Sequence, residues 1–263
     1  MKVKFLIFFL LLFTAFAANE EVNAEEGTIY VGEEIEYEVS FLGFGIGSIK
    51  IETLGKEIQN DREIYHVKAF IKSYDGIPYV GLKTIYESWV DRTLSYSHKF
   101  VGNTKFIGPD WIYQRIDFDY DKNIIHDRQW KKDNLIYEKK FDINKKWNDG
   151  FSLFFLARHY SNLGRTVKVP TFIKDTASTI IDFTGKKENV KIDAVDYPVK
   201  TVYLNGKAKW EGIYGLQGDF EGWFSDDDAH VPIKAYMKVL VGSVKIELIR
   251  WKRGNWQPPG NDT

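Results

Sequence analysis

The sequence predicts a mainly β fold, a curved and largely antiparallel sheet that forms an open barrel or sandwich with meander connections, and one buried helix near residues 149–161. Three observations lead to this prediction. Phe, Trp and Tyr make up 16% of the 263 residues, and such side chains favour pleated surfaces. Apolar and polar residues alternate without a break from Ile35 to Phe41, as in a half-buried strand. Turn-forming residues separate further short strand-like segments.

The first residues have the pattern of a secretory leader. Lys2 and Lys4 precede an apolar run over residues 5–18, which is shorter than the roughly 20 residues that a membrane-spanning helix needs. Small residues at the end of this run predict cleavage after Ala17 or Ala24. We therefore expect a signal peptide over 1–24, a single β-rich domain over 25–253 and a flexible C-terminal tail over 254–263.

Composition narrows the class of protein. The absence of cysteine excludes disulfides, a thiol nucleophile and lipid attachment at a lipobox. The formal net charge is −1 without a basic stripe, which argues against nucleic acid as a partner. No later stretch is long and apolar enough to span a bilayer, so we expect a soluble periplasmic or extracellular protein that is not a lipoprotein and has no transmembrane segment after leader removal.

The first strands form a predicted hairpin. The alternation over 35–41 is broken by the glycines at 43, 45 and 47, and it resumes at Ile49 and Ile51. A third strand, over 64–73, follows the turn signal Gln59-Asn60-Asp61. Five more strand-like segments, separated by turn residues, lie at 84–91, 96–102, 111–120, 123–131 and 135–142.

One segment has helical rather than strand character. Asn148 or Asp149 can cap its start, and Gly164 lies just past its end. Its apolar residues fall on two sides, Phe151, Phe154 and Phe155 on one and Leu153, Leu156 and Tyr160 on the other. A helix that is apolar on both sides is buried, so we expect it to plug the concave face of the sheet, with Phe154 and Phe155 in the core.

Strands resume after the helix, and Asn205-Gly206 is the strongest local hairpin signal in the chain. Pro258-Pro259 lies in the segment from Gly254 onward that we expect to be frayed. The predicted strands of this half lie at 166–172, 178–184, 199–204, 207–210, 218–225, 231–241 and 243–251.

Three stretches carry a family resemblance: the opening hairpin over 32–47, the helix with Asp149 and residues 152–158, and a closing block over 222–232 with 242–244. On these the chain resembles a bacterial family of exported proteins catalogued as domain of unknown function 3108. The resemblance implies a periplasmic or surface-exported β domain with a curved sheet, and it implies no activity. Family members tend to carry arginine where this chain has His230, which argues against anion binding by that loop.

The densest candidate for a metal or acid/base site is Asp226-Asp227-Asp228 with His230. The run lacks the alternating spacing by which a calcium loop points its carboxylates inward, so a solvated turn is the favoured interpretation. The five histidines are scattered, and no nucleophile elbow or phosphate-binding loop occurs. We therefore expect no metal, no cofactor and no catalytic residue.

Arg158, Trp111 and Trp223 are the candidate ligand-binding residues. A guanidinium on an apolar helix needs a partner, and Asp149 cannot reach Arg158 along one helix face. An internal bridge to a carboxylate of the sheet is favoured over a ligand contact for Arg158. Trp111 follows the turn Gly108-Pro109-Asp110, so we expect it at a rim.

The preferred function is that of a non-enzymatic envelope protein which holds an apolar or lipid-like ligand, or docks an envelope partner, on its curved sheet. A carbohydrate-binding module with exposed Trp and Tyr is the alternative, and a carboxylate-based hydrolase is a further one. An apolar cavity favours the first. Coplanar exposed rings beside carboxylates favour the second, and two carboxylates facing each other across a groove favour the third.

Overall fold

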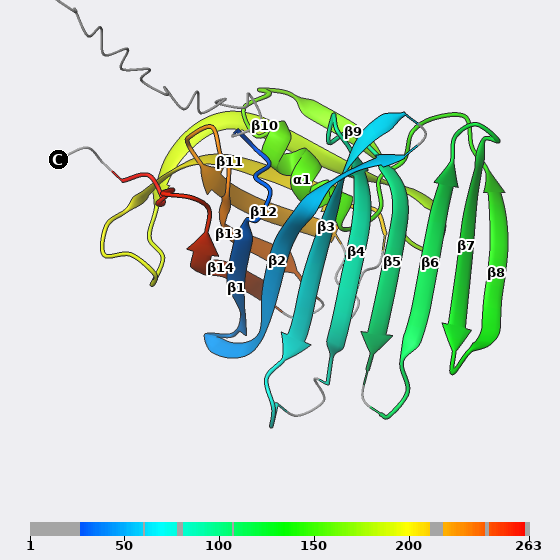
Figure 1. Ribbon diagram of the computed structural model, residues 1–263. Helices are drawn as coiled ribbons and strands as arrows, with labels where there is room; N and C mark the ends of the chain where they lie inside the picture. Colours follow the sequence, from blue (N-terminus) through cyan, green and yellow to red (C-terminus); the bar gives the residue numbers. More distant parts are fainter. Residues whose placement is uncertain are drawn as a thin grey trace, which may run out of the picture.

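A computed structural model describes residues 27–59, 61–77, 81–106, 108–210, 218–239 and 242–260. In this part of the chain, antiparallel strands form a single 14-stranded sheet with one helix, which confirms the predicted fold class (Figure 1). The expected leader lies outside the described residues. None of the described residues belongs to a helix that is long and apolar enough to cross a bilayer.

The first half of the sheet begins with the N-terminal hairpin and continues from β2 on one side of it, and α1 (Ser152–His159) follows these strands in the sequence. They are β1 (Glu34–Phe41), β2 (Phe44–Gln59), β3 (Arg62–Ser73), β4 (Lys83–Asp91), β5 (Ser97–Lys105), β6 (Ile112–Asp119), β7 (Ile124–Lys131) and β8 (Asn134–Asp142). The second half consists of β9 (Thr166–Phe172), β10 (Thr176–Val190), β11 (Val199–Ala208), β12 (Gly218–Ser225), β13 (Pro232–Lys238) and β14 (Ser243–Lys252).

Two meanders meet in the middle of this sheet. Its order is β8-β7-β6-β5-β4-β3-β2-β1-β14-β13-β12-β11-β10-β9, so β1 pairs with β14 and the outermost strands are β8 and β9. Residues before α1 bridge the gap between the two halves: Asn148 forms a parallel bridge with Thr171 of β9, and the Ser97 amide of β5 donates to the Trp147 carbonyl at 2.8 Å. The rings of Phe141 and Phe172 meet at 4.9 Å across the same gap. The sheet is thereby curved around α1 but stays open, because β8 and β9 do not pair with each other (Figure 1).

Asp149 organises the start of α1. Its Oδ1 accepts the backbone N–H groups of Phe151 and Ser152 at 2.7 and 2.8 Å, as expected of a capping residue. Its Oδ2 accepts the Ser88 hydroxyl at 2.6 Å, and its own amide donates to the Ser97 hydroxyl at 3.0 Å. The carboxylate is buried, and burial raises the pKa of Asp149. The cap therefore fixes the helix to β4 and β5.

The two apolar sides of α1 belong to two different core clusters, as the sequence predicts. Phe151 and Phe155 join the larger cluster, which contains inward residues of β1–β7 and β14. Leu153 and Leu156 join the smaller one, formed with β9–β12. Phe155 is fully buried, whereas Phe154 is only partly buried and packs edge-on against Tyr37 at 6.4 Å. The expectation that Phe154 lies in the core is thus corrected: this ring packs against the edge of the larger cluster and stays partly exposed.

The hairpin predicted at Asn205-Gly206 is wrong, because β11 runs through both residues. Gly206 lies opposite Phe220 of β12, and a Cβ at this glycine would collide with that ring and with the Ile180 carbonyl. The glycine therefore serves a close approach of neighbouring groups rather than a turn.

Residues 254–260, expected to be frayed, are held against the sheet. The Trp256 indole N–H donates to Asp227 Oδ2 at 2.7 Å, and the Trp251 indole N–H donates to the Trp256 carbonyl at 3.1 Å. The Tyr197 hydroxyl donates to the Pro258 carbonyl at 2.9 Å. These bonds correct the expectation of a flexible tail for its described part.

Candidate functional site

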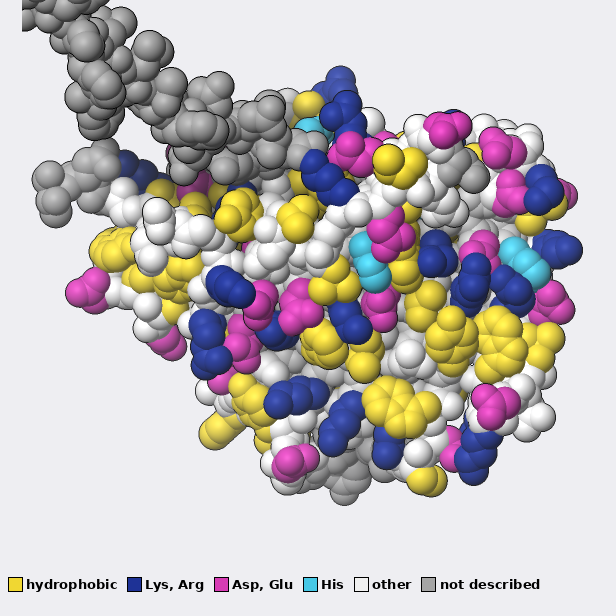
Figure 2. Space-filling view, viewed as in Figure 1, with side chains coloured by type: hydrophobic (Ala, Val, Ile, Leu, Met, Phe, Trp, Pro, Cys, Tyr) yellow, Lys and Arg dark blue, Asp and Glu magenta, His cyan; other side chains and the backbone are white. Residues whose placement is uncertain are grey.

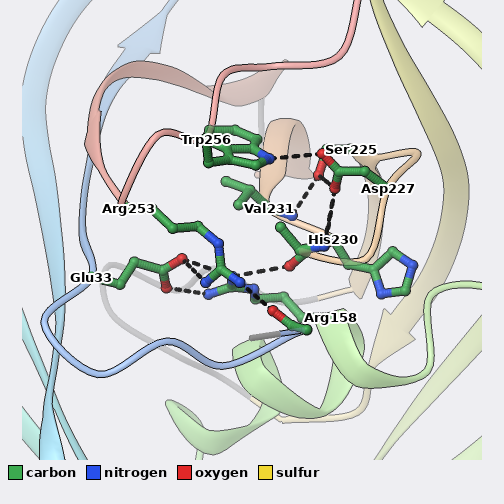
Figure 3. Close-up of polar contacts among 10 residues, drawn as sticks. Glu33, Arg158, Ser225, Asp227, His230, Val231, Arg253 and Trp256 are labelled. Atoms are coloured by element: carbon green, nitrogen blue, oxygen red, sulfur yellow. Dashed lines mark hydrogen bonds and ion pairs between the residues drawn. The ribbon is translucent and has the colours of Figure 1, made fainter. Parts of the chain in front are cut away.

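Arg158 lies in a buried charge cluster at the junction of α1, β1 and β14 (Figure 3). Its Nη1 and Nη2 donate to the two carboxylate oxygens of Glu33 at 2.6 and 3.0 Å, and Nη2 also donates to the Ala229 carbonyl at 3.1 Å. Arg253 Nη1 donates to Glu33 Oε1 at 2.7 Å. Arg158 and Glu33 are 0% and 1% exposed, so no solvent reaches the pair. Desolvation lowers the pKa of Arg253.

The loop between β12 and β13 reaches the same cluster through Ala229, and Asp227 shapes this loop. Asp227 Oδ1 accepts the Ser225 hydroxyl at 2.7 Å and the backbone N–H groups of Ala229 and His230 at 3.1 and 3.2 Å. Its Oδ2 accepts the Trp256 indole N–H (Figure 3). Both oxygens of this carboxylate are therefore used within the protein.

The other polar residues of the loop diverge. Asp226 pairs with Lys187 at 2.8 Å, Asp228 is exposed, and His230 Nε2 lies 2.8 Å from the Asn162 side-chain amide. Burial lowers the pKa of His230, which suits a neutral ring that accepts from Asn162. Among the described residues, no three His, Asp or Glu side chains are arranged to hold a metal ion.

Arg158 and Asp227 thus lie in one corner with their polar atoms bound within the protein, whereas the His230 ring turns away toward Asn162 (Figure 3). Glu33, the partner of Arg158, directly precedes β1, which agrees with the expectation of a partner from the sheet. The corner ties α1, both halves of the sheet and residues 254–260 together. Its chemistry is that of an internal clamp, because the carboxylates and guanidinium groups already bind each other.

The two tryptophan candidates lie far from each other in the sheet order. Trp111 is 41% exposed between β5 and β6, at the end of the strands as expected. Trp223 lies on β12, where its indole N–H donates to Glu188 at 2.7 Å. The rings of Tyr203 and Tyr236 flank it at interplanar angles of 47° and 86°. These rings are not coplanar and do not form a flat platform for a sugar.

A polar surface groove of about 380 Å³ lies beside Trp223. It contains two carboxylates, Glu188 and Asp226, and a lysine contacts each of them: Lys186 at 2.6 Å and Lys187 at 2.8 Å. The hydrogen bonds from Lys186 and Trp223 lower the pKa of Glu188. A general acid needs a carboxyl that retains its proton, so the lowered pKa of Glu188 disfavours that role for this residue.

The concave face of the sheet differs between its two ends. Toward α1 its side chains are buried at 0–7% exposure, among them Ile35, Val67, Val90, Phe100, Ile116 and Ile125. Toward the ends of the strands that carry the β1/β2 and β3/β4 turns, the same face continues with apolar side chains that are partly exposed and outside both core clusters. These are Val39, Phe41, Ile71, Ile112 and Met237. We call this partly exposed region the open face.

Rings and one buried acid border the open face. The Tyr86 ring lies against Gly102 on the neighbouring strand, so a Cβ there would meet it at 3.2 Å. Asp127 of β7 points to the concave side with 0% exposure, and its Oδ1 accepts the Gln114 amide at 2.9 Å. Its Oδ2 is buried without a hydrogen-bond partner, and desolvation raises the pKa of Asp127 to about 6.

Sequence reasoning missed Glu33, Arg253 and Asp127. Glu33 and Arg253 pair across the junction of β1 and β14, and no local sequence pattern predicts this long-range contact. Asp127 does carry a signal: within 123–131 it occupies the same face as Ile125, so it places a charge on the apolar side of the alternation.

A single antiparallel sheet that curves around one helix defines a barrel-like β protein. The sequence matches the family described as protein of unknown function (DUF3108) over residues 36–249, and the chain belongs to this family. A similar solved structure is a β-barrel-like protein of the domain of unknown function DUF1849 from Brucella abortus, with a TM-score of 0.57 and 11% identity. The match covers 87% of this chain and 100% of that chain, and it concerns the fold alone. A search of curated proteins finds no match.

Proposed function

We propose that this protein is an exported envelope protein that holds an apolar, lipid-like ligand on its open face. The observation that carries this proposal is the uneven burial of the concave face: its side chains are fully buried toward α1, while apolar side chains of β1, β3, β6 and β13 at the other end stay partly exposed and outside both core clusters. Concave apolar surfaces with a few polar groups are the usual sites for small ligands. The leader pattern of residues 1–24 supports export.

The walls of the open face suit a molecule with an apolar body. Partly exposed Ile49, Tyr86 and Ile246 pack against the core and form the side nearest α1, and Phe154 of α1 lies against Tyr37 at this boundary. An acyl chain that covers these side chains removes apolar surface from water, which stabilises the complex by about 25 cal/mol per Å² of that surface.

The first test is native mass spectrometry of protein purified from its own envelope, where a co-purified lipid is expected. A second test uses N-phenyl-1-naphthylamine, a neutral apolar probe whose fluorescence rises on leaving water. Ala235→Phe adds a ring to the concave side, because Ala235 lies opposite Gly222 and Ile246, and it should weaken probe binding at least about tenfold.

Asn103→Phe is the matched control. Asn103 lies between Ile85 and Tyr113 on the convex side, so the same ring is added where the open face is not affected. Probe affinity should remain that of the wild type. If no lipid co-purifies and the probe binds all three proteins equally or not at all, the open face is not a ligand site.

A further inference from the structure

Three lysines lie directly opposite one another at the end of the sheet that carries the open face. Lys72 of β3 pairs with Lys83 of β4, and Lys83 pairs with Lys105 of β5. Cross-strand partners lie on the same side of a sheet, and like charges in this position repel. Within the described part of the chain, no ion pair involves any of the three. We call them the lysine row.

Partly exposed apolar and aromatic residues form the next row on the same convex side. Phe70 pairs with Ile85, and Tyr113 pairs with Trp130 one strand beyond Asn103. Figure 2 shows hydrophobic side chains interleaved with Lys and Arg over this part of the molecule. Aromatic rings beside cations are typical of surfaces that meet the headgroup region of a membrane.

The strand ends at this side of the sheet also carry apolar residues that protrude into solvent. They lie in or beside three separate turns: Leu42 and Phe44 at 70% and 75% exposure, Phe106 and Trp111 at 45% and 41%, and Leu135 and Ile136 at the start of β8 at 50% and 52%. We call these six residues the apolar rim.

Both the backbone conformation and the solvent exposure of Leu42 are unfavourable for a leucine. It has a left-handed backbone, φ +49, at a turn position where Asn or Gly is preferred, and its side chain is largely exposed. A leucine at this position contributes nothing to the core and is better explained by a contact outside the chain.

We propose that the lysine row and the apolar rim dock this protein on an anionic lipid bilayer. The unpaired lysines attract the anionic headgroups, and the protruding rim residues enter the interface between headgroups and acyl chains. This orientation places the open face toward the bilayer. The proposal goes beyond ligand binding, and its test needs no bound ligand.

The test is flotation with vesicles, using protein recovered from the soluble periplasmic fraction of a bacterial host. The protein should bind vesicles that contain phosphatidylglycerol and bind pure phosphatidylcholine far less. High salt should reduce binding to the anionic vesicles to the level seen with the neutral ones. The triple variant K72Q/K83Q/K105Q should bind roughly a hundredfold less, because each lysine near an anionic surface contributes about a factor of five. Relief of repulsion should leave its urea midpoint equal or higher, which separates lost docking from unfolding.

A second triple variant, K140Q/K168Q/K191Q, removes the same charge from exposed positions outside the lysine row and should bind within about threefold of the wild type. L42S/F44S should weaken binding, whereas L54S/I58S, at exposed apolar positions of β2 away from the rim, should not. Equal binding to neutral and anionic vesicles, or equal losses in the two lysine variants, would overturn the proposal. So would an unchanged L42S/F44S variant.

Discussion

Glu33 holds two buried arginines, and replacing it with Gln should destabilise the fold more than removing either arginine does. In Glu33→Gln the guanidinium groups of Arg158 and Arg253 stay buried and face a neutral amide. An uncompensated buried charge of this kind typically costs about 3–5 kcal/mol. That is a large part of a total stability of about 5–15 kcal/mol, so the yield of folded protein should fall as well.

Arg158→Met has a different consequence, because Arg253 still donates to Glu33 Oε1 at 2.7 Å. The carboxylate keeps one cation, and the loss is limited to the charged hydrogen bonds of Arg158, about 1–3 kcal/mol. The free energies of unfolding are measured by urea denaturation with linear extrapolation at pH 7. The order Glu33→Gln, then Arg158→Met, then wild type is the expected result.

Glu34→Gln is the matched control. Glu34 pairs at the surface with Lys50 and Lys252, so its loss should change stability by no more than about 1 kcal/mol. If Glu33→Gln is no more destabilising than Glu34→Gln, or if Arg158→Met exceeds Glu33→Gln, the clamp does not work as its geometry indicates.

Three further variants test other parts of the molecule. Burial raises the pKa of Asp127 to about 6 from 3.8, so the native state keeps a proton that the unfolded state releases, and the free energy of unfolding should fall as pH rises from about 4 to 6. Asp127→Asn should remove this pH dependence and raise the free energy of unfolding by at most about 3 kcal/mol at pH 7.5, as measured by urea denaturation. Phe155→Ala should lower the free energy of unfolding by about 3–5 kcal/mol, because this ring is fully buried. Phe154→Ala should lower it clearly less and should also weaken probe binding to the open face. Equal losses of stability in the two variants would contradict the assignment of Phe154 to the border of the open face. Gly206→Ala should lower the free energy of unfolding by about 1–3 kcal/mol, because its Cβ would collide with Phe220 and the Ile180 carbonyl. Gly55→Ala places a Cβ with no atom within 4 Å, so stability should stay equal or rise slightly in the same urea denaturation.

The fold class follows from local patterns that do not depend on distant parts of the chain. Alternation over 35–41 and the two-sided apolar pattern of residues 151–160 report burial directly, so the first hairpin, the helix and its two core contacts are predictable. Asn205-Gly206 misleads because a turn and a crowded strand both favour glycine, and only the position of Phe220 decides between them.

The candidate sites depend on register, which the sequence does not specify. Lys72, Lys83 and Lys105 are unremarkable as separate residues, and their row exists only because β3, β4 and β5 pair in one alignment. Glu33 and Arg253 meet for a similar reason, since a long-range pair of strands brings them together. Asp127 was missed as well, although it alone carries a local signal, a charge on the apolar side of its strand.

The pairing of β1 with β14 has a consequence for how the protein acquires its structure. Each meander contains only neighbouring strands and can form as soon as it is synthesised, but the seam between them joins residues 218 positions apart. Such a contact has a high loop-closure cost and forms late. Until it forms, β1 presents an unpaired edge, to which a β-strand of another molecule can add. A chaperone that shields β1 should therefore raise the yield of monomer, and any change that weakens the seam should favour domain-swapped assemblies over unfolding.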